Sequence, residues 1–236
     1  MSHPTAKNVP PDVSTRQERI FEVCVFLFLI VPSMSLSFLL LRQGSLSFPI
    51  TAAATILRDL ALVTLIVFFL WRNGESKDQV GWRFGGVKDI LLGIVLFVVV
   101  FYGAAYLDQM LLRLGFTSPA ASLPKFLTPN GPGEEALAVV LVIVVAIAEE
   151  VIFRGYLILR FTEITGSTAA AILLSSAIFA VGHGYEGSAG VIMVGFLGLA
   201  FSLVYLWTGS LTAPILMHFL QDFLGIVLVP LLKHRG

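Results

Sequence analysis

Residues 136–154 read ALAVVLVIVVAIAEEVIFR, an apolar run that ends in the charged cluster Glu149, Glu150 and Arg154. Such a run predicts a helix that crosses a membrane. A charged side chain near the bilayer centre costs roughly 2.5 to 3.5 kcal/mol on insertion scales. Three charges this close together therefore indicate mutual pairing, a water-filled cavity or catalysis.

The composition of the chain is typical of a polytopic membrane protein. Of its 236 residues, 57% are hydrophobic and only 13% are charged. A span requires roughly 20 apolar residues, and backbone polar groups in lipid must bond within their own segment. The expected fold is therefore all-α, a polytopic transmembrane helix bundle of about seven helices, seven or eight in number, in a single domain over residues 20–232. The apolar runs that predict these helices are residues 20–41, 50–71, 87–112, 134–161, 167–182, 189–207 and 211–232.

The polar segments bear on topology and partners. Residues 1–19 are polar and contain three prolines, which predicts a disordered tail. Alternating the loops between the two sides of the membrane places more basic residues on the side of the N-terminus, among them Arg19, Arg72 and Arg160. This bias predicts a cytoplasmic N-terminus, and the compact chain fits a prokaryotic inner membrane. Fifteen basic residues balance fifteen acidic ones, so no nucleic-acid partner is expected.

Two histidines, His183 and His218, lie inside the apolar region, and each has a partner at helical spacing. Phe179 precedes His183 by four residues, and Asp222 follows His218 by four, so each pair shares a helix face. Each pair also has a structural explanation: a histidine at a helix end beside a core phenylalanine, and a local hydrogen-bonded pair that holds helices together.

The charged cluster has a helical geometry of its own. Glu150 and Arg154 are four residues apart and can form a structural ion pair. Glu149 is rotated from Glu150 by about 100° on a helix, which leaves it free to face the two histidines across the bundle. Arg58 and Asp59, adjacent in an earlier apolar run, are interpreted as a neutralised pair facing the bundle rather than as catalytic residues.

A carboxylate with two imidazoles is a set of groups that can activate water. A glutamate shielded from bulk solvent can accept a proton from water, and a histidine can share that task or donate to a developing oxyanion. The sequence contains neither H-E-x-x-H nor G-x-S-x-G. Its aspartates in apolar runs, Asp59, Asp108 and Asp222, belong to separate helices and predict no aspartyl dyad. The pattern favours hydrolysis by glutamate and histidine.

In their order and spacing these motifs resemble the CPBP family of intramembrane proteases. This family is also called the CAAX-protease and bacteriocin-processing or Abi family, and it includes the Rce1-type prenyl-protein peptidases. The resemblance covers roughly residues 134–230, and the earlier helices match only in being hydrophobic. The matching pieces are Glu149-Glu150-x-x-x-Arg154, Phe179-x-x-x-His183 and His218-x-x-x-Asp222.

The resemblance implies an intramembrane endopeptidase with a defined set of site residues. Glu149 and His183 would activate a water molecule, and His218 with the residue four positions later would stabilise the oxyanion. The structural or orienting residues of the site would be Glu150, Arg154 and Phe179.

The chain departs from the Rce1-type pattern at Asp222, where those enzymes carry asparagine. An ionised aspartate cannot donate a hydrogen bond. Three roles for Asp222 remain open: it is protonated in its site, it orients His218, or it is a ligand in a metal-dependent variant of the mechanism.

We expect no cofactor, and zinc is the alternative. Glu149, His183, His218 and Asp222 would supply two nitrogen and two oxygen ligands, but four protein ligands would fill a tetrahedral shell and leave no position for water. The expected partners are the lipid bilayer and a membrane-bound peptide or protein substrate, of the prenylated CAAX type or a leader peptide. The rival functions are a membrane transporter and a non-proteolytic immunity scaffold.

Overall fold

The structure is a computed structural model that describes residues 13–43, 47–116 and 125–235. Within these ranges the chain is helical and contains no strand, and it forms seven helices, as expected for a polytopic helical bundle. Two of the seven are composite and continue through a π-helical segment. The elements are α1 (Val13–Gln43), α2 (Phe48–Arg72), η1 (Lys77–Val80), α3 (Gly86–Arg113), η2 (Lys125–Leu127), α4 (Pro132–Glu149), η3 (Glu150–Leu157), α5 (Ile158–Thr165), α6 (Thr168–Gly182), η4 (Gly184–Glu186), α7 (Gly187–Thr208), α8 (Thr212–Asp222), η5 (Phe223–Leu228) and α9 (Val229–Arg235).

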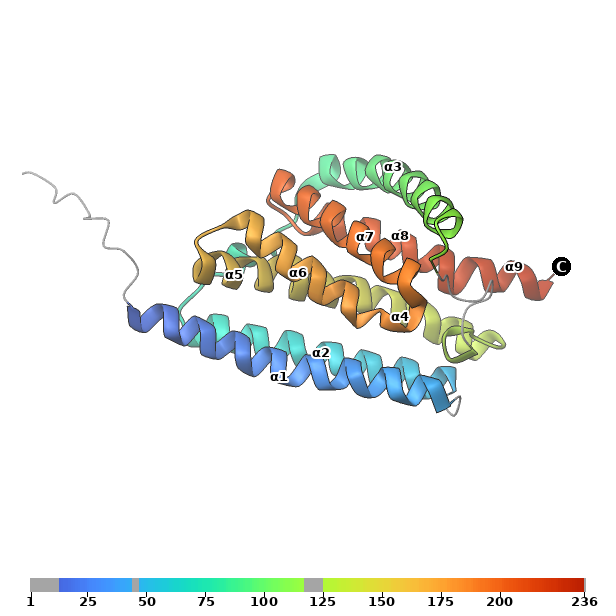
Figure 1. The fold of residues 1–236 in the computed structure, drawn as a ribbon, viewed down its shortest axis with the longest axis horizontal. Helices are drawn as coiled ribbons and strands as arrows, with labels where there is room; N and C mark the ends of the chain where they lie inside the picture. Colours follow the sequence, from blue (N-terminus) through green and yellow to red (C-terminus); the bar gives the residue numbers. More distant parts are fainter. Residues whose placement is uncertain (1–12, 44–46, 117–124, 236) are drawn as a thin grey trace, which may run out of the picture.

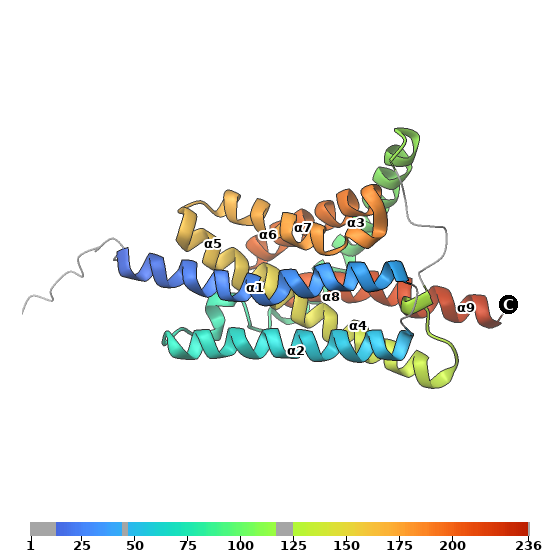
Figure 2. The same cartoon turned by 60° about the horizontal axis from the view of Figure 1, so that its bottom comes forward.

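The helices α4 and α8 pack against each other and link the two halves of the bundle. α2 packs along α4, α3 packs along α8, and α6 packs against both α5 and α7. In Figure 1 α1 and α2 form one edge of the molecule, and α3 forms the opposite edge. Figure 2 again shows α2 and α3 on opposite sides, with α4 and α8 between them.

The main difference from the predicted boundaries lies at the N-terminus. α1 begins at Val13, so residues 13–19, which were predicted to belong to a disordered tail, are helical. The side chain of Arg19 forms ion pairs with carboxylates of neighbouring elements, which explains why a polar stretch extends the helix here. Residues 1–12 of the predicted tail lie outside the described residues.

Within the described ranges, five helices are long and apolar enough to cross a membrane, and α6 is a shorter apolar helix. Large hydrophobic side chains are exposed along α2 and α3, as expected for surfaces that face lipid. The chain is an integral membrane protein. Part of α1 has side chains outside the described set, so its assignment as a span stays a prediction.

Two of the three helices that carry predicted site residues, α4 and α8, change to π-helical winding next to those residues. η3 follows Glu149 directly, and η5 follows Asp222 directly. In a π-helix each hydrogen bond closes between residues i and i+5, so the side chains that follow are rotated relative to an α-helix. Such segments are frequent at functional sites.

A glycine in the first of these segments permits a close contact. A Cβ atom at Gly155 would lie 2.7 Å from the backbone oxygen of Val80 in η1. Any larger residue would push η1 away from η3, which is part of the core. The motif E-E-x-x-x-R is thus followed by a residue that packs the loop after α2 against the helix carrying both glutamates.

A group of buried charges lies in the N-terminal half of α1. Glu22 is fully buried, and its two oxygens contact Arg72 Nη2 at 2.9 Å and Arg160 Nε at 3.1 Å. Asn73 donates to the same carboxylate at 2.8 Å. Arg160 is therefore a buried residue of a network, although the sequence analysis counted it only among the basic residues on the side of the N-terminus. We call the group formed by Arg19, Glu22, Arg72, Glu75 and Arg160 the Glu22 cluster.

Glu75 joins this cluster from the segment after α2, outside the membrane spans. Arg160 and Arg19 both contact its carboxylate. Burial alone would raise the pKa of Glu75, but the hydrogen bond and charge of Arg160, together with the charge of Arg19, outweigh burial. The pKa of Glu75 therefore lies below its ordinary value, and the ionised form supports the contact between α1, α2 and α5.

Candidate active site

The four predicted catalytic residues, Glu149, His183, His218 and Asp222, line one cavity of about 380 Å³ between membrane helices. They come from α4, the end of α6, and α8. The rest of the wall is mainly apolar, and its further polar residues are Thr51, Thr55, Arg58, Tyr185 and Glu186. We call this space the catalytic cavity.

Glu149 is the last residue of α4, and its carboxylate is held loosely. Oε2 lies 3.8 Å from His218 Nε2, and Oε1 lies 3.8 Å from Arg58 Nη2. The side chain is 12% exposed, and within the described part of the chain Oε2 is a buried atom with no hydrogen-bond partner. A buried carboxylate oxygen without a donor is costly. Glu149 Oε2 can therefore accept a hydrogen bond from a molecule bound in the cavity.

His218 lies between the two glutamates of the motif. Its Nδ1 is 2.8 Å from Glu150 Oε1, and its Nε2 is 3.5 Å from Asp222 Oδ2. Both ring nitrogens thus face carboxylates. The contact with Glu150 spans the bundle, so Glu150 orients His218 in addition to pairing with its own helix.

His183 ends α6, and its ring is fixed by its own helix. Nδ1 lies 2.9 Å from the backbone oxygen of Phe179. A carbonyl oxygen can only accept, so Nδ1 must carry the proton in this contact. In the neutral ring Nε2 is then an acceptor. This tautomer suits a residue that shares in the removal of a proton from water.

The predicted ion pair between Glu150 and Arg154 is present, with Arg154 Nη1 at 2.9 Å from Glu150 Oε1. Both side chains are almost completely buried. The guanidinium carbon of Arg154 lies 4.4 Å from the ring centre of Phe179 and 5.3 Å from that of Phe201. A guanidinium over aromatic faces is favourable at a buried position. Phe179 therefore separates Arg154 from His183, whose ring centre is 4.9 Å away.

A comparison with known families identifies the segment that holds these residues. The family model described as Type II CAAX prenyl endopeptidase Rce1-like matches residues 132–224. This segment is Rce1-like. The match runs from the first turn of α4 to just beyond Asp222, and it contains all three motifs that carried the resemblance. No curated protein and no solved structure matches the chain.

The Rce1-like match supports the general class of intramembrane endopeptidase, a hydrolase. It leaves the mechanism, the substrate and the roles of the individual residues as predictions. The helices that precede the Rce1-like segment nevertheless contribute to the cavity, because α2 supplies Arg58.

The placement of Arg58 was not predicted. Its pairing with Asp59 is confirmed, since Nη2 lies 2.7 Å from Asp59 Oδ1. The pair does not stand apart from the site, however, because Arg58 lines the catalytic cavity and reaches Glu149. The only available signal in the sequence was the presence of two adjacent charges in an apolar run, which does not reveal the direction that either side chain faces.

Two aromatic residues of the cavity lining lie next to each other. Tyr185, in the short turn η4, lies next to Phe126 of η2, with ring centres 6.1 Å apart. Both residues line the catalytic cavity. The segment before α4 thus contributes Phe126 and Leu127 to the lining of the cavity.

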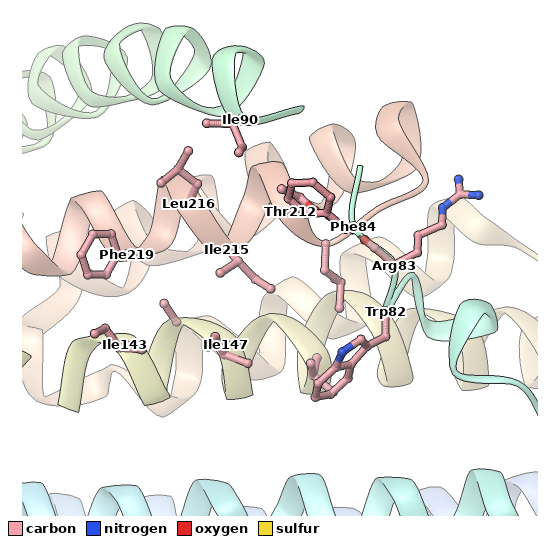
Figure 3. A pocket seen from close by; sticks show the side chains of 13 residues that line it. Trp82, Arg83, Phe84, Ile90, Ile143, Ile147, Thr212, Ile215, Leu216 and Phe219 are labelled. Carbon is pink, nitrogen blue, oxygen red and sulfur yellow. Dashed lines mark hydrogen bonds between the residues drawn. The ribbon is translucent and has the colours of Figure 1, made fainter. Parts of the chain in front are cut away.

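A second cavity of about 600 Å³ lies on the other face of α4 and α8. Figure 3 shows Ile143 and Ile147 of α4 facing Ile215 and Phe219 of α8, with α3 above them. Trp82 lies at one end. This cavity is larger than the catalytic cavity, but its lining contains no histidine or carboxylate. The residues predicted to be catalytic therefore line the smaller cavity.

The arrangement of side chains does not fit a zinc site. Among the described residues, no group of three or more histidine, cysteine, aspartate or glutamate side chains could hold a metal ion. We derive no step through a metal, and the expectation of a cofactor-free enzyme stays a prediction.

Proposed function

We propose that this chain hydrolyses peptide bonds of membrane-associated peptides with a water molecule activated by Glu149 and His183. One observation carries the proposal. Glu149, which has a carboxylate oxygen without a hydrogen-bond donor, and His183, whose Nε2 is free to accept, line the same cavity between membrane helices. The Rce1-like match supports the same reaction class.

In this mechanism Glu149 takes a proton from water as the water oxygen adds to the peptide carbonyl carbon. His183 has Nε2 available as a second acceptor and can relay the proton to the departing nitrogen. The contact of Glu150 with His218 fixes the ring that faces Glu149. Arg154 neutralises the charge of Glu150. In this mechanism Glu150 holds His218 in position, and Glu149 reacts with water.

The geometry favours one of the three open roles of Asp222. Its carboxylate lies 3.5 Å from His218 Nε2 and can orient that ring as an acceptor. An ionised carboxylate in this position holds His218 in place but gives nothing to an oxyanion. We therefore assign Asp222 to the positioning of His218.

For the substrate we propose a peptide with a lipid anchor, such as a prenylated peptide with a CAAX-type C-terminus. Support comes from the description of the matching family and from the apolar residues in the cavity wall, which include Ile50, Leu127, Leu141 and Val145. A cytoplasmic N-terminus and a prokaryotic membrane remain part of the proposal.

The test uses the full chain, purified and reconstituted into vesicles. Prenylated CAAX-type peptides, the same peptides without a prenyl group, and leader-type peptides are offered to the wild type, Glu149→Gln and Glu135→Gln. Glu135 lies in the first turn of the same helix α4 and is the matched control. We expect cleavage by the wild type and by Glu135→Gln. Loss of a general base costs about 10²- to 10⁴-fold in rate, so Glu149→Gln should lose cleavage while it keeps its thermal midpoint.

Cleavage by the wild type that survives in Glu149→Gln contradicts the assigned base. Absence of cleavage with every peptide, accompanied by solute flux into the vesicles, contradicts the protease and favours the rival transporter.

A further inference from the structure

Arg58 of α2 is the only arginine or lysine among the residues that line the catalytic cavity. Three carboxylates line the same cavity, from Glu149, Glu186 and Asp222. The other cation of the site, Arg154, is 1% exposed and lies against Glu150 and the ring of Phe179. Arg58 is thus the one permanent positive charge among these lining residues.

The guanidinium of Arg58 is held by one side and open on the other. Nε donates to Asp59 Oδ1 at 2.8 Å, and Nη2 lies 2.7 Å from the same oxygen. Asp59 is completely buried, whereas the side chain of Arg58 is 28% exposed. A guanidinium has five N–H groups in a rigid fork. Asp59 occupies one edge of this fork and leaves further N–H groups for another acceptor.

The reaction needs such a donor. When water adds to a peptide carbonyl, the carbonyl oxygen becomes an oxyanion, and donors aimed at it are a large part of catalysis. His218 has both ring nitrogens directed at carboxylates, and an ionised Asp222 cannot donate. The two groups that the family resemblance assigned to the oxyanion therefore have no uncommitted donor for it in this geometry.

We propose that Arg58 is the catalytic residue that stabilises this oxyanion, an inference that rests on the proposed function. In the first step the water oxygen forms a bond to the carbonyl carbon, the carbon–oxygen π pair moves to the oxygen, and Glu149 takes the proton. The oxyanion accepts hydrogen bonds from Arg58. In the second step the pair returns, the carbon–nitrogen bond breaks, and the departing nitrogen receives the proton that Glu149 took.

Arg58 could also be thought to bind the terminal carboxylate of the substrate, but the distances favour the role at the oxyanion. An extended peptide advances about 3.3 to 3.6 Å per residue. The terminal carboxylate of a C-a-a-X sequence therefore lies roughly 10 Å from a bond cleaved after the cysteine. Arg58 Nη2 lies only 3.8 Å from Glu149 Oε1. A guanidinium this close to the base lies beside the reacting carbonyl and not beside the end of the peptide.

The first test compares kcat and KM in the wild type, Arg58→Lys and the double variant Arg58→Met/Asp59→Asn. The double variant removes both charges of the pair and so avoids an unpaired buried aspartate. Removal of one oxyanion donor lowers kcat about 10²- to 10³-fold. We expect that loss in the double variant, a smaller one in Arg58→Lys, and little change in KM. Arg113→Met, at the exposed end of α3, is the control and should leave kcat unchanged.

The second test measures binding and does not depend on turnover. A phosphinic peptide carries the negative charge of the tetrahedral intermediate, and transition-state analogues bind more tightly than substrates. Its affinity should fall about 10²-fold or more from the wild type to the double variant. The substrate peptide itself is measured in the inactive Glu149→Gln background. Its affinity should be the same with and without the further substitutions Arg58→Met and Asp59→Asn.

An unchanged kcat, or an equal loss of affinity for peptide and phosphinic peptide, overturns the role of Arg58. Equal affinity of the wild type and the double variant for the phosphinic peptide overturns it as well. If the wild type cleaves no peptide, the proposed function fails separately, and the phosphinic comparison still decides whether Arg58 recognises the oxyanion. A melting curve of the double variant shows that the fold is retained.

Discussion

The molecule contains two groups of buried charges, and they differ in how fully their acceptors are satisfied. In the Glu22 cluster, Glu22 receives contacts from Arg72, Asn73 and Arg160, and neither of its oxygens lacks a partner. In the catalytic cavity, Glu149 keeps an oxygen without a donor, as far as the described residues extend. Charge buried in an apolar bundle therefore does not by itself indicate a reactive site. An excess of acceptors over donors beside a cavity is the better indicator.

The largest expected effect that separates the two groups comes from Glu22→Gln. Removing one partner from a buried ion pair costs about 3 to 5 kcal/mol, because the remaining charge stays buried. We expect a strongly lowered midpoint of thermal unfolding in detergent, while the folded fraction still cleaves peptide at the wild-type rate per molecule. Glu149→Gln should do the reverse.

A lower rate of peptide cleavage in Glu22→Gln, without a lower thermal midpoint, would contradict this contrast between the two groups. It would place the Glu22 cluster in the catalytic machinery, although none of its members lines the catalytic cavity.

Glu150→Gln should show an intermediate outcome, because Glu150 belongs to both kinds of environment. It pairs with Arg154 within its helix and with His218 across the bundle. A glutamine keeps the shape but removes the charge, which leaves Arg154 buried without an anion. We expect a loss of stability at the lower end of the range of about 3 to 5 kcal/mol for a buried ion pair that loses one partner, and a fall in kcat because His218 is no longer oriented.

The measurement is a thermal melt alongside kcat on the reconstituted protein, with Glu135→Gln as the control. A melt identical to the wild type with normal kcat contradicts the bracing role.

These pairs also show how much of the site could be read from the sequence. The contact of Glu150 with Arg154 follows from a spacing of four residues on one helix, and it was predicted. The contact of Glu150 with His218 joins residues on two helices, and it depends on how those helices are rotated about their axes. The π-helical segments η3 and η5 change that rotation where the site residues lie. The pattern of apolar residues does not predict π-helical winding.

The fold was more predictable than the site for a physical reason. Each span must be apolar over its whole length, so seven runs of residues predict seven helices, and this expectation is confirmed. The environment of a charge within a span carries no such signature. Arg160 and Arg58 both stand near apolar runs, yet one is locked in the Glu22 cluster and the other reaches the catalytic cavity.

The smallest expected effect is a dependence of stability on acid that arises in the Glu22 cluster. The pKa of Glu75 is lowered in the folded chain, with burial opposed and outweighed by Arg160 and Arg19. A carboxyl group with a lowered folded pKa stabilises the fold fully above its unfolded pKa, about 4.3 for glutamate. That contribution is lost as the pH falls below this value toward the folded pKa.

Glu75→Gln removes the group and with it this part of the pH dependence. The midpoint of the wild type should exceed that of Glu75→Gln at pH 7, and the difference should shrink as the pH falls from about 5 to 3. The neighbouring carboxylates of Glu22 and Glu163 are present in both proteins, so the difference between the two curves isolates Glu75. A difference that stays constant over this range would mean that Glu75 does not respond to the arginines around it. The Glu22 cluster would then be held by packing, and the comparison with the catalytic cavity would have to rest on burial alone.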